Sequence, residues 1–368
     1  MKLLPLAALL AAAVGWFLPL QAGGSGAGGL PGAVLLLLAL ACALHGRLVS
    51  LTVMVFAALA GAWLPVLALQ GSGAQGGSGY WLAYLGQIVA AVAGAALVSL
   101  QDSDANDSTL RRRLRELVPP AAVPVVLLLL WQGLVIGFAV PKGIFPGVHH
   151  VVEQLRGSLP VLLGDSYVTF VQEVALGLLA GVGAGFLAGC AIALSRFMQA
   201  GFLPLAVAFG AVPIVGLAPV LGRAFGVDWE SKAAVVVIVT FFPVVLNTVQ
   251  GLLQVDPLKL ELMAAYAARP LDVFLKVRLP NALPYIFNAL KVGVVVAVIS
   301  VIVAEFLIPG PPRGLGQRIS LSARQGAFDT AFAAIVVSSV FSILIYAFVS
   351  FLERATTGWH ASNRGEEG

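Results

Sequence analysis

The chain has 368 residues, of which 60% are hydrophobic and only 10% are charged. A soluble globular domain carries roughly a quarter charged residues, so this composition, with a mean hydropathy of +0.98, excludes a soluble protein. The formal charge of +4 does not indicate nucleic-acid binding, because the basic residues flank apolar runs, where Lys and Arg set membrane topology.

Apolar runs of about 20 residues recur along the chain, and a helix of that length crosses a hydrocarbon layer of about 30 Å. They lack the alternation that is typical of a transmembrane barrel. The sequence therefore predicts an all-α polytopic membrane protein with about ten transmembrane helices, four in an N-terminal module and six in a second module.

The N-terminal module is predicted over residues 1–100. Its four spans are expected at residues 4–21, 31–46, 49–69 and 81–100. We expect the first span to be a retained helix rather than a cleaved signal peptide, because no clear small-x-small cleavage site follows it. Lys2 and Arg47 flank one side, and the loops on the other side are uncharged. The positive-inside rule therefore predicts a cytoplasmic N-terminus.

A polar stretch at residues 101–118 predicts a cytoplasmic linker, whose basic end holds Arg111, Arg112, Arg113 and Arg115. The second module is predicted over residues 119–355, with a cytoplasmic tail at 356–368. Its six spans are expected near residues 121–140, 168–195, 202–222, 233–252, 283–308 and 330–352. Counting from the linker puts residues 253–282 inside and the segments 141–167, 223–232 and 309–329 outside.

Residues 256–280 form a charged, amphipathic insert between two apolar runs. Asp256-Pro257 predicts a helix start, because Asp caps free N–H groups and Pro suits the first helical position. Leu258, Leu262 and Tyr266 then recur at helical spacing. Arg269, which precedes Pro270, is expected to end this helix, and a second short helix should follow before the next span starts at Leu279-Pro280.

Two interpretations of the insert are open on physical grounds. One is an amphipathic helix that lies on the lipid surface. The other is a docking surface for a soluble partner.

The insert resembles the signature loop of bacterial ABC importer permeases, and the residues that match it in register are Glu261, Ala268, Phe274, Val277, Leu279 and Pro280. The resemblance extends over roughly residues 120–360. It includes Phe145-Pro146-Gly147, residues 217–220 and 225–232, Phe241-Phe242-Pro243 with Asn247 and Gly251, Ala304-Glu305, and Gly314-Leu315-Gly316. These motifs are similar to the sulfonate, taurine and nitrate branch, which also contains transporters of pyrimidine precursors.

The resemblance implies a homodimeric permease of the bacterial inner membrane, with about six core spans per subunit. It also implies a cytoplasmic ABC ATPase dimer that docks on residues 256–280, and a periplasmic or lipid-anchored solute-binding protein. The substrate would be a small polar or anionic organic solute, namely a sulfonate, nitrate or a pyrimidine or vitamin precursor, moved by alternating access.

The chain itself lacks the Gly-x-x-x-x-Gly-Lys-Ser/Thr loop that binds ATP phosphates. We therefore expect a transport subunit rather than an enzyme, with ATP-Mg bound by the partner, and no catalytic residue, metal or cofactor in this chain. Membrane lipid is an expected contact, and nucleic acid is not an expected partner.

Two departures from the family pattern fall within the insert. Leu262-Met263 follows Glu261 where the family has Ala-Ala, and Ala267 stands where the family has a glycine. That glycine would permit a left-handed bend without a Cβ penalty. Pro270 is the residue available to supply the break in its place.

The predicted ATPase-coupling residues are Glu261, Leu262, Tyr266, Ala267, Ala268, Arg269, Phe274, Leu279 and Pro280. The candidates for a pathway or gate are Glu305, Phe241, Phe242 and Asn247. Each gate candidate has a plainer alternative: a structural hydrogen bond for Glu305, packing at a Pro243 bend for the two phenylalanines, and an interhelical hydrogen bond for Asn247.

Other polar residues have simpler expected roles. Glu173 is expected as an interfacial anchor and Lys291 as a snorkelling side chain, whereas His149 and His150 are expected as a solvated pair. Gly181, Gly185 and Gly189 lie on one helix face and predict close helix packing.

Two other functions are considered. An ion-coupled secondary transporter would show inverted repeats and paired membrane acids, and the sequence shows neither. A membrane scaffold or sensor would depend on the N-terminal module.

Overall fold

The computed structural model describes residues 3–22, 39, 42–43, 48–70, 72–101, 108–210, 213–308, 310–311 and 313–358. Its contacts divide the chain into two compact units, Met1–Glu153 and Gln154–Gly368. The described elements are all helices, so the predicted all-α polytopic fold is confirmed. Among the described residues, seven helices are long and apolar enough to cross a membrane, or eight if one bent pair counts as a single span.

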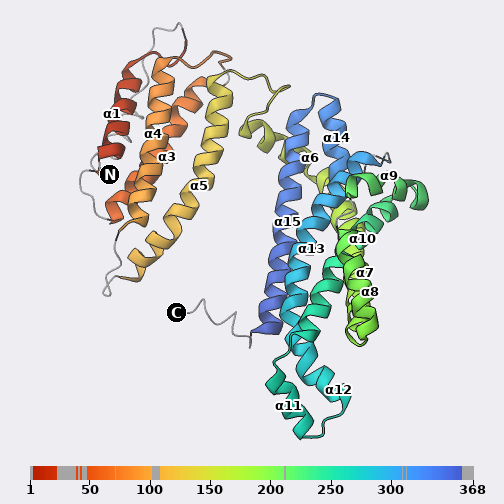
Figure 1. Cartoon of the computed structure of the whole chain (residues 1–368). Helices are drawn as coiled ribbons and strands as arrows, with labels where there is room; N and C mark the ends of the chain where they lie inside the picture. Colours follow the sequence, from red (N-terminus) through yellow and green to blue (C-terminus); the bar gives the residue numbers. More distant parts are fainter. Residues whose placement is uncertain are drawn as a thin grey trace. The chain divides into compact units, whose positions relative to one another are not determined.

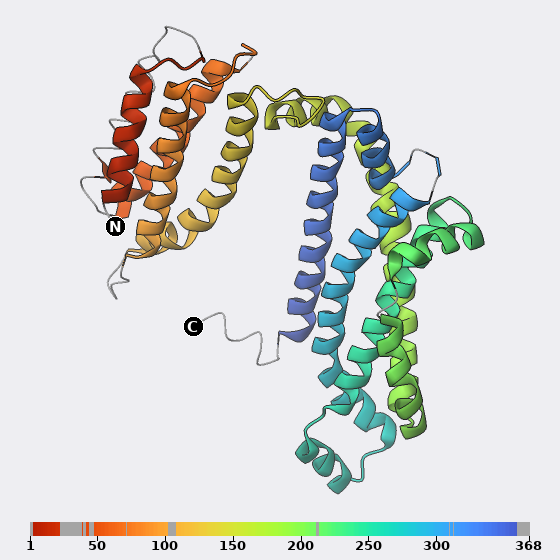
Figure 2. The ribbon, with the colours of Figure 1, turned by 45° about the horizontal axis from the view of Figure 1, so that its top comes forward.

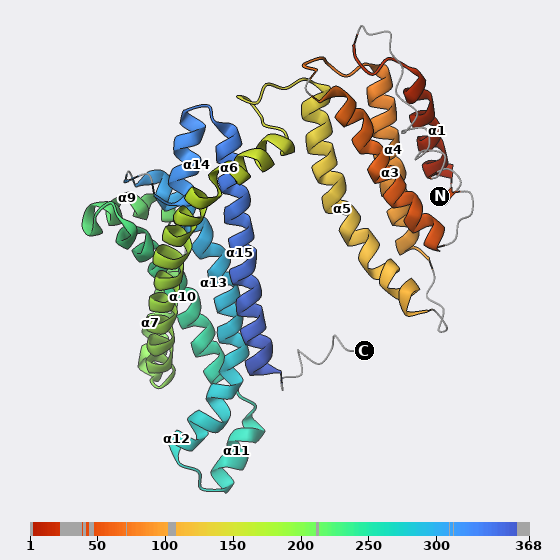
Figure 3. The same ribbon diagram turned by 180° about the vertical axis from the view of Figure 1, so that it is seen from behind.

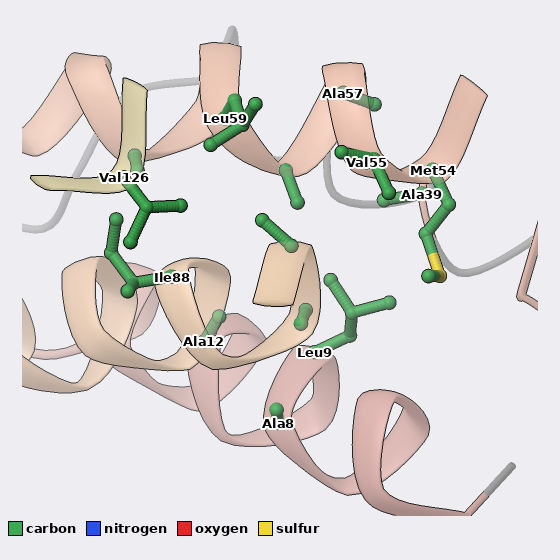
Figure 4. Packing of buried hydrophobic residues seen from close by; sticks show 14 of the residues in the cluster. Ala8, Leu9, Ala12, Ala39, Met54, Val55, Ala57, Leu59, Ile88 and Val126 are labelled. Atoms are coloured by element: carbon green, nitrogen blue, oxygen red, sulfur yellow. The ribbon is translucent and has the colours of Figure 1, made fainter. Parts of the chain in front are cut away.

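Unit 1 is a bundle centred on α4 (Ser78–Ser99), which packs against α1 (Leu3–Phe17), α3 (Leu48–Leu69) and α5 (Thr109–Gly137) (Figure 1). Its apolar core includes Leu9, Met54, Ile88 and Val126, which meet from different helices (Figure 4). The span predicted at 31–46 lies almost entirely outside the described residues. The first span is shorter than predicted, because α1 has 15 residues.

Helix α5 differs from the sequence prediction in its start and in its partners. It begins at Thr109, inside the predicted linker, and runs through Pro119, Pro120 and Pro124. The arginine-rich segment consists of good helix formers, so it extends the helix. Residues Tyr80 and Tyr84 of α4 donate hydroxyl hydrogen bonds of 2.6 Å to carbonyls of α5. This helix, predicted to open the second module, therefore packs within unit 1.

Unit 2 begins inside α6 (Val148–Ser166), which continues through the π-helix η1 (Tyr167–Ala175) into α7 (Leu176–Ala193). The three elements form one helix of 46 residues. The span expected near residues 168–195 therefore belongs to a longer helix that begins at Val148, within the segment 141–167 that was predicted to lie outside. The sequence hides this helix because Pro160 and polar residues interrupt its apolar pattern.

The span predicted at 202–222 is broken into two helices. The structure has α8 (Arg196–Gly210) and α9 (Ile214–Phe225), which meet at a bend of 100°. Pro213 caps α9 with an extended ψ of 116°, a conformation that cannot continue α8. The continuous hydropathy of the segment concealed this bend.

The centre of unit 2 is α10 (Trp229–Leu253), packed between α7 and α13 (Leu279–Leu307). Helix α15 (Phe328–Thr357) packs on α13 and on α14 (Leu315–Arg324). Two short helices, α11 (Pro257–Ala265) and α12 (Pro270–Val273), project from one end of this unit, opposite the end that holds α9 and α14 (Figures 1, 2 and 3).

Gly177, Gly181, Gly185 and Gly189 line the face of α7 that meets α10, so the predicted close packing of this stripe is confirmed. A Cβ on Gly185 would lie 2.8 Å from the Phe241 carbonyl oxygen, and one on Gly189 would lie 2.7 Å from the Thr248 Cβ. Only hydrogen fits at these positions. The absence of side chains brings the two backbones together, as is common in membrane bundles.

Candidate functional site

The segment that projects from unit 2, residues 256–280, is called the projecting segment. It begins as the sequence predicts. Asp256 caps α11 by accepting a hydrogen bond of 2.9 Å from the Leu258 N–H, and Pro257 occupies the first helical position. The cap satisfies one of the free N–H groups at the helix start.

The end of α11 is a Schellman motif built on an alanine. The Ala268 N–H donates to the Met263 carbonyl at 3.0 Å, and the Ala267 N–H donates to the Ala264 carbonyl at 2.9 Å. Ala267 has a φ of +48°, the left-handed conformation that glycine adopts without strain. The bend therefore lies at Ala267 itself, and the expectation that Pro270 replaces it is wrong; Pro270 instead starts α12.

Replacing Ala267 by glycine is expected to stabilise this bend by about 0.5–1 kcal/mol, because it removes the Cβ clash of the left-handed conformation. Hydrogen exchange of the peptide that covers residues 256–270 should then slow by about two- to fivefold. Ala264→Gly, which replaces a right-handed helical alanine, serves as the matched control and should speed exchange. Equal or faster exchange in Ala267→Gly would contradict the strained bend.

The apolar stripe of α11 faces away from the bundle. Leu258, Leu262 and Tyr266 are 71%, 56% and 77% exposed. The other predicted coupling residues of this segment are exposed at Glu261, Ala267 and Arg269 and half-buried at Ala268, Phe274, Leu279 and Pro280. The segment therefore offers a contiguous surface on which apolar side chains alternate with charges.

The base of the segment is tied to the bundle. Asn281 Nδ2 donates to the Gly251 carbonyl at 2.8 Å and to the Gln254 carbonyl at 3.1 Å. The Tyr285 hydroxyl donates to Gln254 Oε1 at 2.9 Å. These bonds join the start of α13 to the end of α10.

No break separates the second short helix from the next span, contrary to the prediction at Leu279-Pro280. Helix α12 continues through the π-helix η2 (Phe274–Arg278) into α13, and the three form one helix of 38 residues. The wider turn of η2 lies directly before Pro280, whose missing N–H disrupts the regular α-helical pattern.

A second polar site lies at the opposite end of α13. Glu305 is fully buried there, and its Oε1 accepts a hydrogen bond of 2.7 Å from the Thr169 hydroxyl. Its Oε2 accepts one of 2.9 Å from the Gln317 N–H. Gly314 and Gly316 leave room for this carboxylate, since a Cβ on either would lie within 2.6 Å of a Glu305 oxygen.

Neighbouring ion pairs and hydrogen bonds hold the same loop. Asp165 accepts from the Gly314 N–H at 3.2 Å and pairs with Arg318 at 2.7 Å. Thr169 also accepts a hydrogen bond of 2.9 Å from the Leu315 N–H. Asp165 and Thr169 on the helix that contains α6 and η1, together with Glu305 on α13, therefore hold the start of α14 in place.

Glu173 is part of this buried site, so the prediction of an interfacial anchor is wrong. It is 1% exposed on η1 and lies beside the buried Glu305 carboxylate, with the Lys232 ammonium near enough to interact with it. Lys232, predicted in an outer loop, is itself buried and donates to the Val227 and Asp228 carbonyls. These paired membrane acids come from different helices, so their proximity could not be predicted from the sequence pattern of either helix.

Phe241 and Phe242 lie in α10 beside Pro243, as predicted. The Phe242 ring stacks on Phe209 of α8 with centroids 5.1 Å apart and planes 3° apart, and Phe241 meets Phe242 edge-on. Phe209, Phe242 and Pro243 line a cavity of about 190 Å³ among α8, α9, α10 and α13. Asn247 donates to the Pro243 carbonyl within its own helix at 2.8 Å, not to another helix.

Comparison with known proteins places residues 181–358 in the family described as the binding-protein-dependent transport system inner membrane component. A protein of Haemophilus influenzae named as a probable ABC transporter permease protein is 32% identical over 236 residues, which are 64% of this chain and 95% of that protein. The chain belongs to the ABC transporter permease family.

Two further relatives have named substrates. The formylaminopyrimidine transport permease protein of Halalkalibacterium halodurans is 31% identical over 186 residues, covering 50% of this chain and 74% of that protein. The taurine transport system permease protein of Escherichia coli is 25% identical over 241 residues, covering 64% and 87%.

The family match lies within unit 2. Residues 181–358 include the projecting segment, Glu305 and the cavity, but not η1, which supplies Thr169 and Glu173. Unit 1 lies outside this match. The permease is a transport subunit, and neither the secondary-transporter nor the scaffold interpretation is supported by the comparisons.

Two other predictions for polar residues of the permease are wrong. Lys291 does not snorkel; its ammonium pairs with Glu353 of α15 at 2.8 Å, and both side chains are largely buried. His149 and His150 are half-buried rather than solvated, and Gln132 Nε2 donates to His149 Nδ1 at 2.8 Å. In both cases the partner lies on another helix: Glu353 on α15 pairs with Lys291 on α13, and Gln132 on α5 bonds to His149 on α6.

Proposed function

We propose that this permease imports a small organic solute across the bacterial inner membrane, powered by a separate cytoplasmic ABC ATPase dimer. The observation that carries the proposal is the projecting segment of unit 2. It exposes Leu258, Leu262 and Tyr266, which a soluble partner would cover. Exposed apolar patches rimmed by charges are typical of protein interaction sites.

The proposed topology puts this segment and the N-terminus in the cytoplasm. Arg111, Arg112, Arg113 and Arg115 support that assignment, because Lys and Arg near span ends are retained inside. Two copies of the permease would form the transport pathway, and a solute-binding protein would deliver the substrate from the outer side. The relatives named for transport of taurine and of formylaminopyrimidine indicate the range of solutes to consider.

Reversal of the charge at Glu261 tests the ATPase interaction. Glu261→Arg, or deletion of residues 258–270, is expected to abolish co-purification of the ATPase while membrane insertion stays intact. Glu261 is exposed, so its replacement should leave the bundle stable. The measurement is the amount of ATPase retained on the tagged permease, together with the membrane-bound yield.

Glu153→Arg provides the matched control, because Glu153 is also an exposed helical glutamate but lies outside the projecting segment. It should retain the ATPase at the wild-type level. Undiminished co-purification in Glu261→Arg and in the deletion variant would rule out docking at this segment. It would then favour the alternative in which the helix lies on lipid.

A further inference from the structure

The cavity beside Phe242 has a chemical character that bears on the substrate. Its described lining consists of ten residues from α8, α9, α10 and α13, and each has a hydrocarbon side chain or is glycine. No cationic or hydrogen-bonding side chain therefore belongs to the described lining.

An inorganic anion or a sulfonate would be poorly accommodated there. Moving a charge out of water into apolar surroundings is very costly unless a partner compensates it. Neither Lys291, which pairs with Glu353, nor Lys232, which bonds to backbone carbonyls, lines the cavity. A neutral solute avoids this cost.

The aromatic rings favour a flat solute. Phe209 and Phe242 present parallel faces, and a planar ring can extend such a stack in the offset geometry that aromatic pairs prefer. The cavity of about 190 Å³ is smaller than typical sites for drug-sized ligands, which are roughly 300–1,000 Å³. It therefore suits a single ring system.

The backbone adds one polar feature. In a regular helix, the N–H of residue 243 would donate to the carbonyl of Val239, but Pro243 has no N–H. Both residues line the cavity. The Val239 carbonyl is therefore left without its regular helical donor, and an amino or ring N–H group of a solute can satisfy it.

From these features we infer that the cavity receives a neutral, planar, single-ring heteroaromatic solute that carries an N–H donor. The inference rests on the proposed import function and names its substrate class. It selects against taurine and nitrate as solutes of this permease.

Binding to the full-length permease in lipid nanodiscs tests this inference without the ATPase. Equilibrium dialysis with radiolabelled 4-aminopyrimidine, taurine and nitrate should show binding of 4-aminopyrimidine alone. Phe242→Leu keeps the cavity apolar but removes the ring, and should weaken binding by about five- to tenfold. Gly210→Val should weaken it at least as much, because a Cβ at Gly210 meets open space and valine would fill part of the cavity.

Matched controls keep the result specific. Gly216 also has open space around its Cβ position but does not line the cavity, so Gly216→Val should bind like the wild type. Phe225→Leu replaces an exposed phenylalanine and should also leave binding unchanged. The melting temperature of each variant, measured in the same nanodiscs, separates lost binding from lost folding.

Two results would overturn the inference: tighter binding of taurine or nitrate than of 4-aminopyrimidine, or unchanged binding in a folded Gly210→Val variant. Failure of the proposed import function would look different. In that case 4-aminopyrimidine would still bind in the nanodiscs, but proteoliposomes containing the permease, its ATPase and its solute-binding protein would take up none of the three probes on ATP addition.

Discussion

Replacing Gly181 by leucine is expected to prevent unit 2 from folding, with a loss of about 4 kcal/mol or more. A Cβ at this position would overlap the Thr240 hydroxyl and lie 2.9 Å from the Val237 carbonyl oxygen. Relief would require α7 and α10 to separate, and α10 is the central helix of the unit. Fluorescence-detected size exclusion of the solubilised protein should show aggregate in place of a single peak.

The same helix supplies the control. Gly183 lies two residues away, is exposed, and has no atom within 4 Å of its Cβ position. Gly183→Leu should therefore give a wild-type elution profile. If both leucine variants aggregate, the loss of folding results from placing leucine in α7 and not from the contact between α7 and α10.

A smaller substitution permits a quantitative test of the contact. Gly181→Ala should cost about 1–3 kcal/mol. Thr240→Ala removes the hydroxyl that the new Cβ meets, so the double variant should be less destabilised than the sum of the two single variants. A strictly additive double variant would show that the Thr240 side chain is not the obstacle.

The second large effect is expected at Glu305. Glu305→Ala leaves the Thr169 hydroxyl and the Gln317 N–H without an acceptor, and each buried orphan costs about 1–3 kcal/mol. The total of about 2–6 kcal/mol should lower the melting temperature in detergent by on the order of 10 °C. The loop at Gly314–Arg318 should also become more accessible to protease.

Glu305→Gln separates the structural role from the gate role that the sequence left open. The glutamine oxygen can accept from Gln317 and its amide can donate to Thr169 Oγ1, so most stability should be kept. Loss of transport in a stable Glu305→Gln variant would support a gate. Retained transport, with loss of stability only in Glu305→Ala, would leave Glu305 a structural residue. An unchanged melting temperature in Glu305→Ala would contradict the buried network itself.

The parts of the fold that the sequence predicted are governed by local patterns. Apolar length predicted most spans, and Asp256-Pro257 predicted the start of α11, because a cap and a first-turn proline act within a few residues. The four-residue spacing of Gly181, Gly185 and Gly189 predicted the packed face of α7 for the same reason.

The errors share a different physical origin. The pairing of Glu173 with Glu305 and that of Lys291 with Glu353 depend on which helices lie side by side, and a single sequence does not encode that directly. The bend between α8 and α9 falls within an uninterrupted apolar stretch, so hydropathy alone could not reveal it. At Ala267 the left-handed conformation is imposed by the two hydrogen bonds that end α11, against the preference of alanine.

The helix from Pro270 to Leu307 has a mechanical consequence. Its 38 residues follow one continuous helical path of about 57 Å, with the projecting segment at one end and Glu305 near the other. Between these ends, Asn281 ties the helix to the end of α10 through its two hydrogen bonds. From Asn281 the helical path measures about 16 Å to Pro270 and about 36 Å to Glu305. A shift of α12 would therefore be carried along one continuous helix, past its hydrogen bonds to the end of α10, to the Glu305 loop.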